Sequence, residues 1–237
     1  MTYRYTQSAV YYDMIADAQG KDYAREAGEV LALIRQLRPE AQSLCDVACG
    51  TGRHLEHFCE ELGCVGVDLD PDMLAVAAGR CDGVTLVQGD MCCLAMEQRF
   101  DVVTCLFSAV GYARNESDLG AAVSSMAGLL NPGGLLVVEP WLQSQAWDTG
   151  RVSVSIARSD ELDVVRMDLA GREGDRAVLD FHFLVGRRGE VESFTEQHVL
   201  TLFSWEQYAD AFAGAGLDFV IDKVGISGRG LLTGWAR

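Results

Sequence analysis

The sequence predicts an α/β fold, with a doubly wound, mostly parallel sheet covered by helices on both faces and an antiparallel β insertion beside it. Over residues 22–141, short apolar runs alternate with helical segments, which is typical of a parallel sheet. After residue 141, apolar and polar residues alternate with period two between turns, which is typical of antiparallel strands. The chain has 237 residues, of which 49% are hydrophobic, enough for one sizeable core.

The first part of the chain supplies the parallel strands and their helices. Residues 22–38 have apolar positions at helical spacing and stop before Pro39, so they form a helix. Buried strands are predicted at 43–48, 64–70, 84–90, 100–107 and 135–141. Connecting helices are predicted at 52–62, 71–80 and 117–130. Pro71 suits the first turn of its helix, with Asp70 as N-cap, and "NPGG" at 131–134 is a turn.

The second part of the chain supplies the antiparallel strands and completes the core. Four alternating runs are expected to be strands, at 152–159, 162–170, 177–186 and 192–203. Residues 204–217 form a helix, with Ser204 as N-cap and the Glu206–Gln207 pair near its start. The chain then ends in the apolar run 219–225, a loop and the strand 231–236. No repeat or low-complexity linker divides the chain, so we expect one domain over residues 1–237.

Composition and charge argue against several classes of partner. The formal net charge is −16 and no basic cluster extends beyond Arg187–Arg188, so a nucleic-acid partner is not expected. No apolar run approaches the ~20 residues needed to span a bilayer, and the N-terminus is too polar for a signal peptide. We therefore expect a cytoplasmic protein without a membrane partner. The eight cysteines lack metal-type spacing, which favours reduced thiols and no metal site.

The stretch "LCDVACGTGRHL" at residues 44–55 joins a strand to a helix through a glycine-rich turn. Its pattern is Asp46-x-Ala48-x-Gly50-x-Gly52, not the G-x-G-x-x-G of a dinucleotide-binding turn. It also lacks the Lys-Ser/Thr pair of a phosphate-binding loop. The acid at the start opposes an anionic group directly above it. The turn therefore suits a ligand with a cationic ammonium group.

Two further acids follow the next two strands. Asp68 ends a strand about 20 residues after Asp46, the spacing at which a carboxylate accepts hydrogen bonds from both ribose hydroxyls. Asp90 is placed to accept from an adenine amino group, and Met91 offers a backbone N–H and an apolar face. These positions share the carboxyl edge of the sheet, where doubly wound folds bind ligands. A ligand with ribose, adenine and ammonium but no phosphate is predicted, and S-adenosylmethionine fits this description.

Five motifs in order resemble those of the class I S-adenosylmethionine-dependent methyltransferases, which have a Rossmann-like fold: "DVACGTG", "GVDLDPDML", "QGDM", "FDVVTCLFS" and "LLNPGGLLVVEPW". Other segments resemble the bacterial N,N-dimethyltransferases that act on dTDP-linked amino-deoxysugars, on the way to desosamine and mycaminose: "GKDYAREA", "DVACGTGRHLEHF", "EPW", "HVLTLF" and "SGRGL". The resemblance implies a homodimer and a nucleotide-linked amino-sugar substrate. It assigns residues 1–141 to the N-terminal segment and cofactor-binding core, 142–203 to the substrate and dimer side, and 204–237 to the rest of the core.

The resemblance also implies which residues hold the cofactor. An N-terminal segment folds over the site in that family, and Tyr12 before Asp13 matches its tyrosine that reaches the cofactor. The full set is Tyr12, Asp46, Ala48, Gly50, Gly52, Asp68, Leu69, Asp90, Met91 and Leu106. The sequence departs from the family at Ala48, where the general motif has glycine. It departs again at Asp68, where the family often has the longer glutamate.

The expected catalytic residues are Tyr5, Tyr112 and His198. Tyr5, or alternatively Tyr3, matches the tyrosine that reaches the transfer site in the resembling family. Tyr112 stands where some relatives have histidine, so an imidazole base is not obligatory there. His198 lies in a strand pattern and either faces the substrate or is a satisfied core histidine.

Three residues are expected on the substrate side. Arg229, flanked by glycines, could grip a diphosphate bidentately, or it is a solvated loop arginine. Lys21 is the second candidate for the diphosphate. Trp141 either lines the cleft or is an ordinary buried tryptophan. His54 and His57 are interpreted as packing or surface residues.

The predicted function is transfer of methyl groups to the amino group of a nucleotide-linked deoxysugar, in antibiotic or other natural-product biosynthesis. An unprotonated amine is a good nucleophile, so positioning is the main requirement and neither a metal nor a strong base is needed. Two rounds give the dimethylamine. Two alternatives remain: a sugar or small-molecule O-methyltransferase, which would want a dedicated base such as His198, and a cofactor-binding protein without transfer activity.

Overall fold

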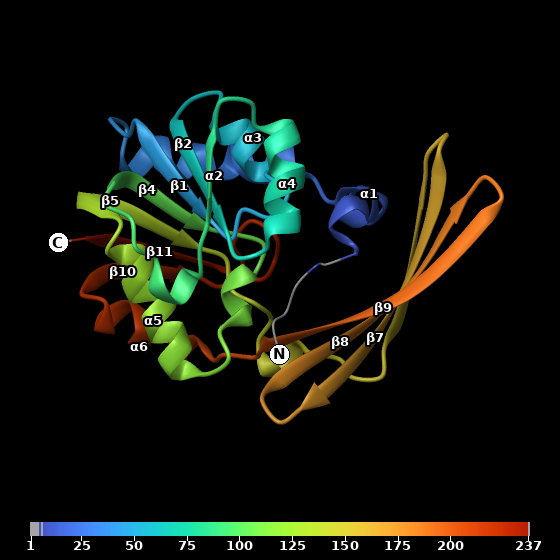
Figure 1. Ribbon diagram of the computed structural model, residues 1–237. Coiled ribbons are helices and arrows are strands. Elements are labelled where there is room, and N and C mark those ends of the chain that lie inside the picture. The colour runs from blue at the N-terminus through green and yellow to red at the C-terminus, as the bar shows by residue number, and fades with distance from the viewer. Residues whose placement is uncertain (1–4, 6, 237) are drawn as a thin grey trace.

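The computed structural model describes residue 5 and residues 7–236, which form two β-sheets (Figure 1). The larger sheet has the strand order β10-β11-β5-β4-β1-β2-β3. Its parallel strands are β1 (Ser43–Val47), β2 (Gly63–Asp68), β3 (Thr85–Gln88), β4 (Phe100–Cys105) and β5 (Leu130–Val138). The antiparallel strands β10 (Leu217–Asp222) and β11 (Leu231–Ala236) complete one edge. The predicted doubly wound, mostly parallel sheet is confirmed.

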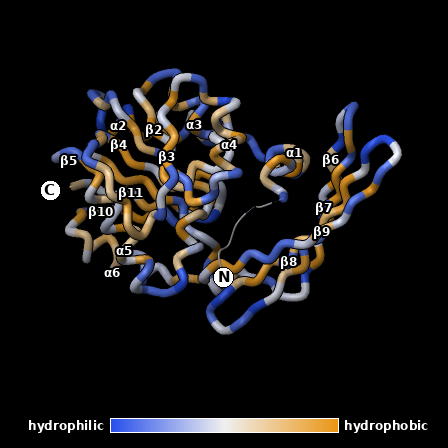
Figure 2. Tube along the Cα trace, in the orientation of Figure 1, coloured by the Kyte–Doolittle hydropathy of each residue, from blue (hydrophilic) through white to orange (hydrophobic). Residues whose placement is uncertain are grey.

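Helices cover both faces of this sheet. They are α2 (Tyr23–Leu37), α3 (Arg53–Phe58), α4 (Pro71–Arg80), α5 (Glu116–Ala127) and α6 (Trp205–Gly214), whereas α1 (Tyr12–Ala18) lies against the second sheet. Short 3₁₀ helices are η1 (Ala9–Tyr11), η2 (Met91–Cys93), η3 (Ala109–Tyr112) and η4 (Ser144–Ala146). One face is packed by α5 and α6, through residues such as Met126 and Phe212, and the other by α2, through Val30 and Ile34. Hydrophobic residues therefore concentrate in the strands between these layers (Figure 2).

The second sheet is a four-stranded antiparallel sheet that projects beside the first (Figure 1). Its strands, in spatial order, are β6 (Val152–Arg158), β7 (Leu162–Glu173), β8 (Arg176–Arg187) and β9 (Glu190–Thr201). Helix α1 packs on its inner face, where Tyr11 and Ile15 join a small core with Val164 and Phe183. The predicted antiparallel insertion is confirmed, and it lies next to the segment that enters the molecule from the N-terminus.

Helix ends follow the local chemistry of the sequence. Helix α4 spans the predicted residues, and the Asp70 carboxylate accepts from the Asp72 N–H at 2.9 Å. Helix α6 begins with a full capping box between Ser204 and Gln207. Helix α3 ends at Phe58, four residues before the predicted end, because the next turn tightens to i→i+3 bonds such as Glu61 N–H to the Phe58 carbonyl.

Strand β5 begins earlier than predicted. The "NPGG" stretch lies inside its bounds because Leu130 pairs with Phe100, after which the register shifts before Val102 pairs with Leu135. Gly133 accommodates the local bend with a positive φ of 68°.

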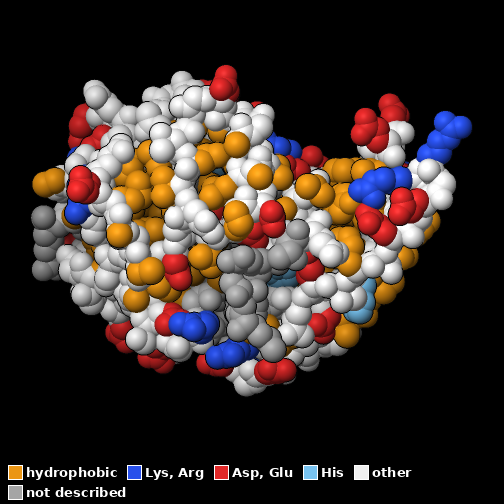
Figure 3. Space-filling view, in the orientation of Figure 1, with side chains coloured by type: hydrophobic (Ala, Val, Ile, Leu, Met, Phe, Trp, Pro, Cys, Tyr) orange, Lys and Arg blue, Asp and Glu red, His pale blue; other side chains and the backbone are white. Residues whose placement is uncertain are grey.

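Charged side chains on the visible face of the molecule lie in small groups (Figure 3). On the face drawn in Figure 3, basic side chains lie next to acidic ones and form no continuous basic area. Across residue 5 and residues 7–236, no helix has the length and apolar character needed to cross a membrane. Within the same residues, no group of three histidine, cysteine or acidic side chains is arranged to hold a metal ion.

Candidate active site

Two cavities lie side by side and share one aromatic wall. The first, of about 410 Å³, is lined at the carboxyl edge of the large sheet by Ala48, Gly50, Asp68, Leu69, Asp90, Met91 and Leu106. The second, of about 350 Å³, lies toward the small sheet and is lined by Trp141, Trp147, Arg151, Arg166, Phe181 and Arg229. Four residues line both cavities: Tyr5, Tyr12, Phe107 and Tyr112. A donor bound in one cavity and an acceptor in the other would therefore meet at this wall.

The glycine-rich turn needs left-handed backbone at three positions. The φ angles of Ala48, Gly50 and Gly52 are 58°, 56° and 78°. Ala48 adopts this conformation with a side chain, at a cost on the order of 1 kcal/mol. Gly52 does not line the cavity. It allows α3 to pack on α4, since an added Cβ would lie 2.9 Å from Cys81 Sγ.

Asp68, at the end of β2, is hydrogen-bonded to the glycine-rich turn that it faces. Its Oδ2 accepts from the Gly50 N–H at 2.7 Å and its Oδ1 from the Asp70 N–H at 2.8 Å. Burial raises the pKa of Asp68, while these hydrogen bonds oppose the rise. A carboxylate has about four acceptor sites. Both oxygens therefore keep capacity for a ribose diol.

Asp46 lies behind the turn and does not line the cavity. It is 2% exposed, and its Oδ1 accepts from Thr104 Oγ1 at 2.7 Å. Burial raises its pKa to about 6. Its predicted interaction with an ammonium group stays a prediction.

The remaining wall of the first cavity suits a nucleoside. Asp90 is exposed at the rim, where its carboxylate accepts from the Cys92 N–H at 2.8 Å. Leu106 is buried and Leu69 is exposed, and both offer apolar surface near Met91. Arg114, the cation at this rim, is already paired with Asp118. An acid for ribose, an acid for adenine and apolar walls with no free cation among the described lining residues fit S-adenosylmethionine.

A line of hydrogen bonds runs through the shared wall. Tyr5 Oη lies 2.9 Å from Tyr112 Oη, which lies 2.9 Å from His198 Nδ1. The Tyr5 ring packs on the His198 ring with centroids 4.3 Å apart and planes tilted by 33°, and it meets the Tyr12 ring edge-on at 5.2 Å. Burial raises the pKa of all three tyrosines, so the phenols stay neutral at pH 7. His198 itself lines neither cavity.

The N-terminal segment is tied to the large-sheet side of the site. The Tyr5 N–H donates to Asp70 Oδ2 at 2.7 Å, beside the first cavity. Asp13 accepts from Thr51 Oγ1 in the glycine turn and from Arg80, both at 2.6 Å. This anchoring agrees with the predicted cover over the site. The alternative candidate Tyr3 lies outside the described residues.

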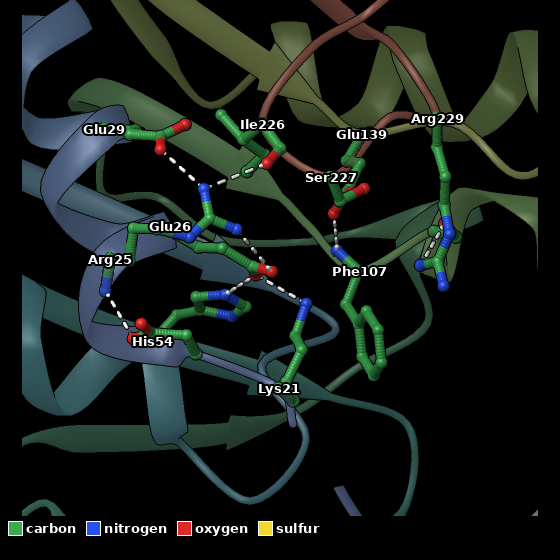
Figure 4. A network of polar contacts seen from close by, with 12 residues as sticks. Lys21, Arg25, Glu26, Glu29, His54, Phe107, Glu139, Ile226, Ser227 and Arg229 are labelled. Atoms are coloured by element: carbon green, nitrogen blue, oxygen red, sulfur yellow. Dashed lines mark hydrogen bonds and ion pairs between the residues drawn. The ribbon is translucent and has the colours of Figure 1, made fainter. Parts of the chain in front are cut away.

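Arg229 and Phe107 form the junction of the second cavity with a buried polar network (Figure 4). Glu139 is fully buried and accepts from the Phe107 N–H at 2.6 Å and from the Ser227 hydroxyl. The Arg229 guanidinium lies 5.2 Å from the Phe107 ring and donates to Ser108 Oγ at 3.2 Å. The loop that carries Arg229 is thereby held against the turn that carries Phe107.

Lys21 does not reach either cavity. Its ammonium pairs with Glu26 and lies 3.7 Å from the Phe107 ring centroid, on the side away from Arg229 (Figure 4). Glu26 also lies 3.0 Å from His54 Nε2, and this network is buried. Burial lowers the pKa of Lys21, although Glu26 opposes the fall. Its contact with a substrate stays a prediction, and the packing interpretation of His54 agrees with the structure.

Several wall residues were not predicted from the sequence. Trp141, which was predicted, packs on Trp147 with ring centroids 5.8 Å apart. Arg166 pairs with Asp168 at 2.6 Å and lies 4.3 Å from the Phe181 ring. Their signal was the alternation in 162–170 and 177–186, since every second residue of a strand faces the same side. The alternation does not predict which part of the molecule that face covers.

The sequence is similar to known proteins over nearly its whole length. Residues 44–134 match the family model described as a methyltransferase domain. A dTDP-3-amino-3,4,6-trideoxy-alpha-D-glucopyranose N,N-dimethyltransferase of Streptomyces venezuelae is 44% identical, over 94% of this chain and 95% of that protein. A dTDP-3-amino-3,6-dideoxy-alpha-D-glucopyranose N,N-dimethyltransferase of Streptomyces fradiae is 40% identical, over 95% of this chain and 89% of that protein.

The fold agrees with these sequence relationships. The solved structure of an amino pentose methyltransferase from Micromonospora echinaspora, with bound S-adenosylmethionine, is 36% identical to this chain. It superposes with a TM-score of 0.87 over 96% of this chain and 97% of that one. Its cofactor is the ligand that suits the first cavity of this chain. The chain therefore belongs to the class I S-adenosylmethionine-dependent methyltransferases, in the family of the dTDP-amino-deoxysugar N,N-dimethyltransferases.

Proposed function

We propose that this enzyme methylates the 3-amino group of a dTDP-linked 3-amino-deoxyhexose twice, in an antibiotic or related natural-product pathway. The observation that carries the proposal is the pair of cavities with one shared aromatic wall. The names of the two relatives above supply the position of the amine and the dimethylated product. S-adenosylmethionine supplies an electrophilic methyl group when bound, and the chain's own residues do the rest by positioning.

The neutral phenols at the wall orient the amine. Tyr5 and Tyr112 line both cavities, and their hydroxyls lie 2.9 Å apart. Each hydroxyl donates one hydrogen bond and accepts others, so an unprotonated amine can be held with its lone pair free. Well-oriented reactants gain effective molarities on the order of 10⁵–10⁸ M. This positioning is sufficient for displacement at an activated methyl group.

The second cavity offers positive charge for a diphosphate. Arg166 is neutralised by Asp168. No carboxylate in the described part of the chain lies within ion-pairing distance of Arg151 or Arg229, and both line this cavity. We propose that Arg229, the less exposed of the two, grips the diphosphate, and that the tryptophan pair of Trp141 and Trp147 provides apolar surface beside it.

A homodimer through the outer face of the small sheet is part of the proposal. Exposed apolar residues line up across its strands, where Val152 pairs with Leu169 and Val154 with Met167. A contiguous apolar face of this kind is typical of a protein interface. Val154→Asp should convert the dimer to a monomer in analytical ultracentrifugation. A dimer that persists in this variant would move the interface elsewhere.

We also propose that the chain works as one domain in the cytoplasm. All eight cysteines are free, as expected in a reducing compartment. The substrate-side cavity takes residues from the large sheet, the small sheet and the C-terminal loop, so residues 1–141, 142–203 and 204–237 complete one site together.

Mass spectrometry of defined nucleotide sugars tests the proposed function. The enzyme and S-adenosylmethionine are incubated separately with a dTDP-3-amino-deoxyhexose, its 4-amino isomer, its 3-hydroxy analogue and the free amino-sugar. We expect a mass gain of two methyl groups with the 3-amino compound. Preference for the 4-amino isomer would overturn the position, and methylation of the hydroxyl would support the O-methyltransferase alternative. Cofactor binding without any mass gain would support a binding protein.

A further inference from the structure

The line of hydrogen bonds in the shared wall continues beyond the tyrosines to a buried carboxylate. His198 Nε2 lies 3.7 Å from Glu196 Oε2 and has no hydrogen-bond partner among the described residues. The two side chains share the inner face of β9, since they are two residues apart on one strand. With Tyr112 donating to Nδ1, the neutral imidazole carries its proton on Nε2, facing Glu196.

His198 is buried and lines neither cavity, and hydrogen bonds through Tyr112 and Tyr5 connect it to them. It is 1% exposed, and its ring lies between the Tyr5 ring at 4.3 Å and the Phe181 ring at 4.9 Å. Other charges that act on the line are Arg166 on β7, which is paired with Asp168, and Asp68 across the first cavity.

Glu196 is held in its charged form by the N-terminal segment. It accepts from the Gln7 N–H at 3.0 Å, the Ser8 N–H at 3.2 Å and the Ser8 hydroxyl at 2.5 Å. Burial pushes the pKa of Glu196 up, but His198 and these hydrogen bonds outweigh it and keep the pKa below its usual range. A fixed negative charge therefore faces the unpartnered ring nitrogen of His198.

Double methylation requires a proton to leave the nitrogen between the two transfers, and a line of hydrogen bonds can carry such a proton. The first transfer converts a neutral amine into a secondary ammonium, which has no lone pair. One N–H proton must leave before the nitrogen attacks a second methyl group. The wall around the transfer site is formed by half-buried aromatic side chains, and the hydroxyls of Tyr5 and Tyr112 offer the proton a path through groups that belong to the chain.

We infer that Tyr5, Tyr112 and His198 form a proton relay that restores the lone pair between the two transfers, with Glu196 as the positioning residue that holds the proton on His198. This inference rests on the proposed function. The ammonium gives a proton to Tyr5 Oη, Tyr5 gives its own to Tyr112, and Tyr112 gives its own to His198 Nδ1. The products are a neutral secondary amine and an imidazolium whose charge is balanced by Glu196.

Glu196→Gln tests the relay, because it removes the charge and keeps an oxygen that can accept from Gln7 and Ser8. The ratio of monomethylated to dimethylated product is followed by mass spectrometry over time. We expect the second methylation to slow at least about tenfold more than the first, so that the monomethylated sugar accumulates. His198→Gln should give the same accumulation. Raising the pH from 7 to 9 should restore the dimethylated product, because solvent then deprotonates the intermediate.

Glu192→Gln is the matched control on the same strand. Glu192 also anchors the N-terminal segment, through Tyr11 Oη at 3.1 Å, but it pairs with Arg187 and does not face His198. If both variants accumulate the intermediate equally, anchoring explains the effect and the relay is wrong. An unchanged product ratio in Glu196→Gln overturns the relay while the wild type still dimethylates. If the wild type methylates neither the amino-sugar nor its monomethyl derivative, the proposed function itself has failed.

Discussion

Replacing Arg229 by alanine is the most direct test of how a chain of net charge −16 holds a doubly anionic substrate. Other arginines near the site are already paired, as Arg80 is with Asp13 and Arg166 with Asp168. Arg229 instead donates to a neutral hydroxyl, and its guanidinium lies 5.2 Å and 5.3 Å from the rings of Phe107 and Trp141. Its charge is therefore available to phosphate oxygens in the second cavity.

The magnitude follows from the bonds that a guanidinium makes to a phosphate. A hydrogen bond to a charged group contributes about 1.5–3 kcal/mol, which corresponds to about 10- to 100-fold in affinity. Arg229→Ala should raise the KM for the nucleotide sugar by this factor and leave the Kd for S-adenosylmethionine nearly the same. Arg229→Lys should recover part of the loss, since a point charge replaces a planar fork. Arg151→Ala should cost less, because Arg151 is exposed and more screened.

Steady-state kinetics at fixed ionic strength, with calorimetry for the cofactor, measure these effects. The free amino-sugar is the control substrate, and wild type and Arg229→Ala should be similarly poor with it. Equal KM values for all variants on the nucleotide sugar would show that Arg229 does not hold the diphosphate. Equal use of the free sugar by the wild type would refute the nucleotide-sugar assignment.

Four further variants test the cofactor side and the glycine-rich turn. Asp68→Asn should weaken S-adenosylmethionine binding about 10- to 100-fold in calorimetry, and unchanged affinity would refute the ribose role. Burial raises the pKa of Asp46 from 3.8 to about 6, so its ionisation lowers stability as the pH rises from about 4 to 6 and the full cost is present above pH 6. Asp46→Asn should therefore stabilise the apo protein at pH 8 by up to about 3 kcal/mol and at pH 4 hardly at all. Equal gains at both pH values in urea unfolding would exclude this cause. Gly52→Ala should lower Tm more than Gly50→Ala. Both glycines have positive φ, but only a Cβ at position 52 would clash, with Cys81 Sγ. Equal losses of Tm would contradict the packing role of Gly52.

The fold could be predicted where local chemistry decides it. Asp70 followed by Pro71 marks the start of α4, and Ser204 with Gln207 marks the start of α6, because N-caps act within one turn of the chain. The end of α3 and the start of β5 were predicted less well. Both depend on bonds that the pattern of hydrophobic residues does not specify, such as the pairing of Leu130 with Phe100.

The site could be predicted where its residues follow one another along the sheet edge. Ala48, Gly50, Asp68 and Asp90 line one cavity because successive parallel strands end at that edge. The contact of Tyr112 in η3 with His198 in β9 joins residues 86 positions apart, and no periodicity encodes it. The position of Lys21 could not be predicted from periodicity either. Lys21 lies behind Phe107 because it is paired with Glu26 in a buried network, and the sequence pattern does not single out Glu26.

The anchoring of the N-terminal segment has a consequence for the order of events in turnover. Each dimethylated molecule consumes two molecules of cofactor, so the first cavity has to be emptied and refilled while one sugar is being completed. Tyr5 and Tyr12 line both that cavity and the one proposed for the sugar, and Asp13 ties their segment to Thr51 in the glycine turn. Release of the spent cofactor therefore requires this short stretch of chain to loosen, whereas retention of the monomethylated sugar requires it to stay in place. How firmly that stretch is held decides whether the monomethylated sugar stays for its second methyl group or leaves and has to return.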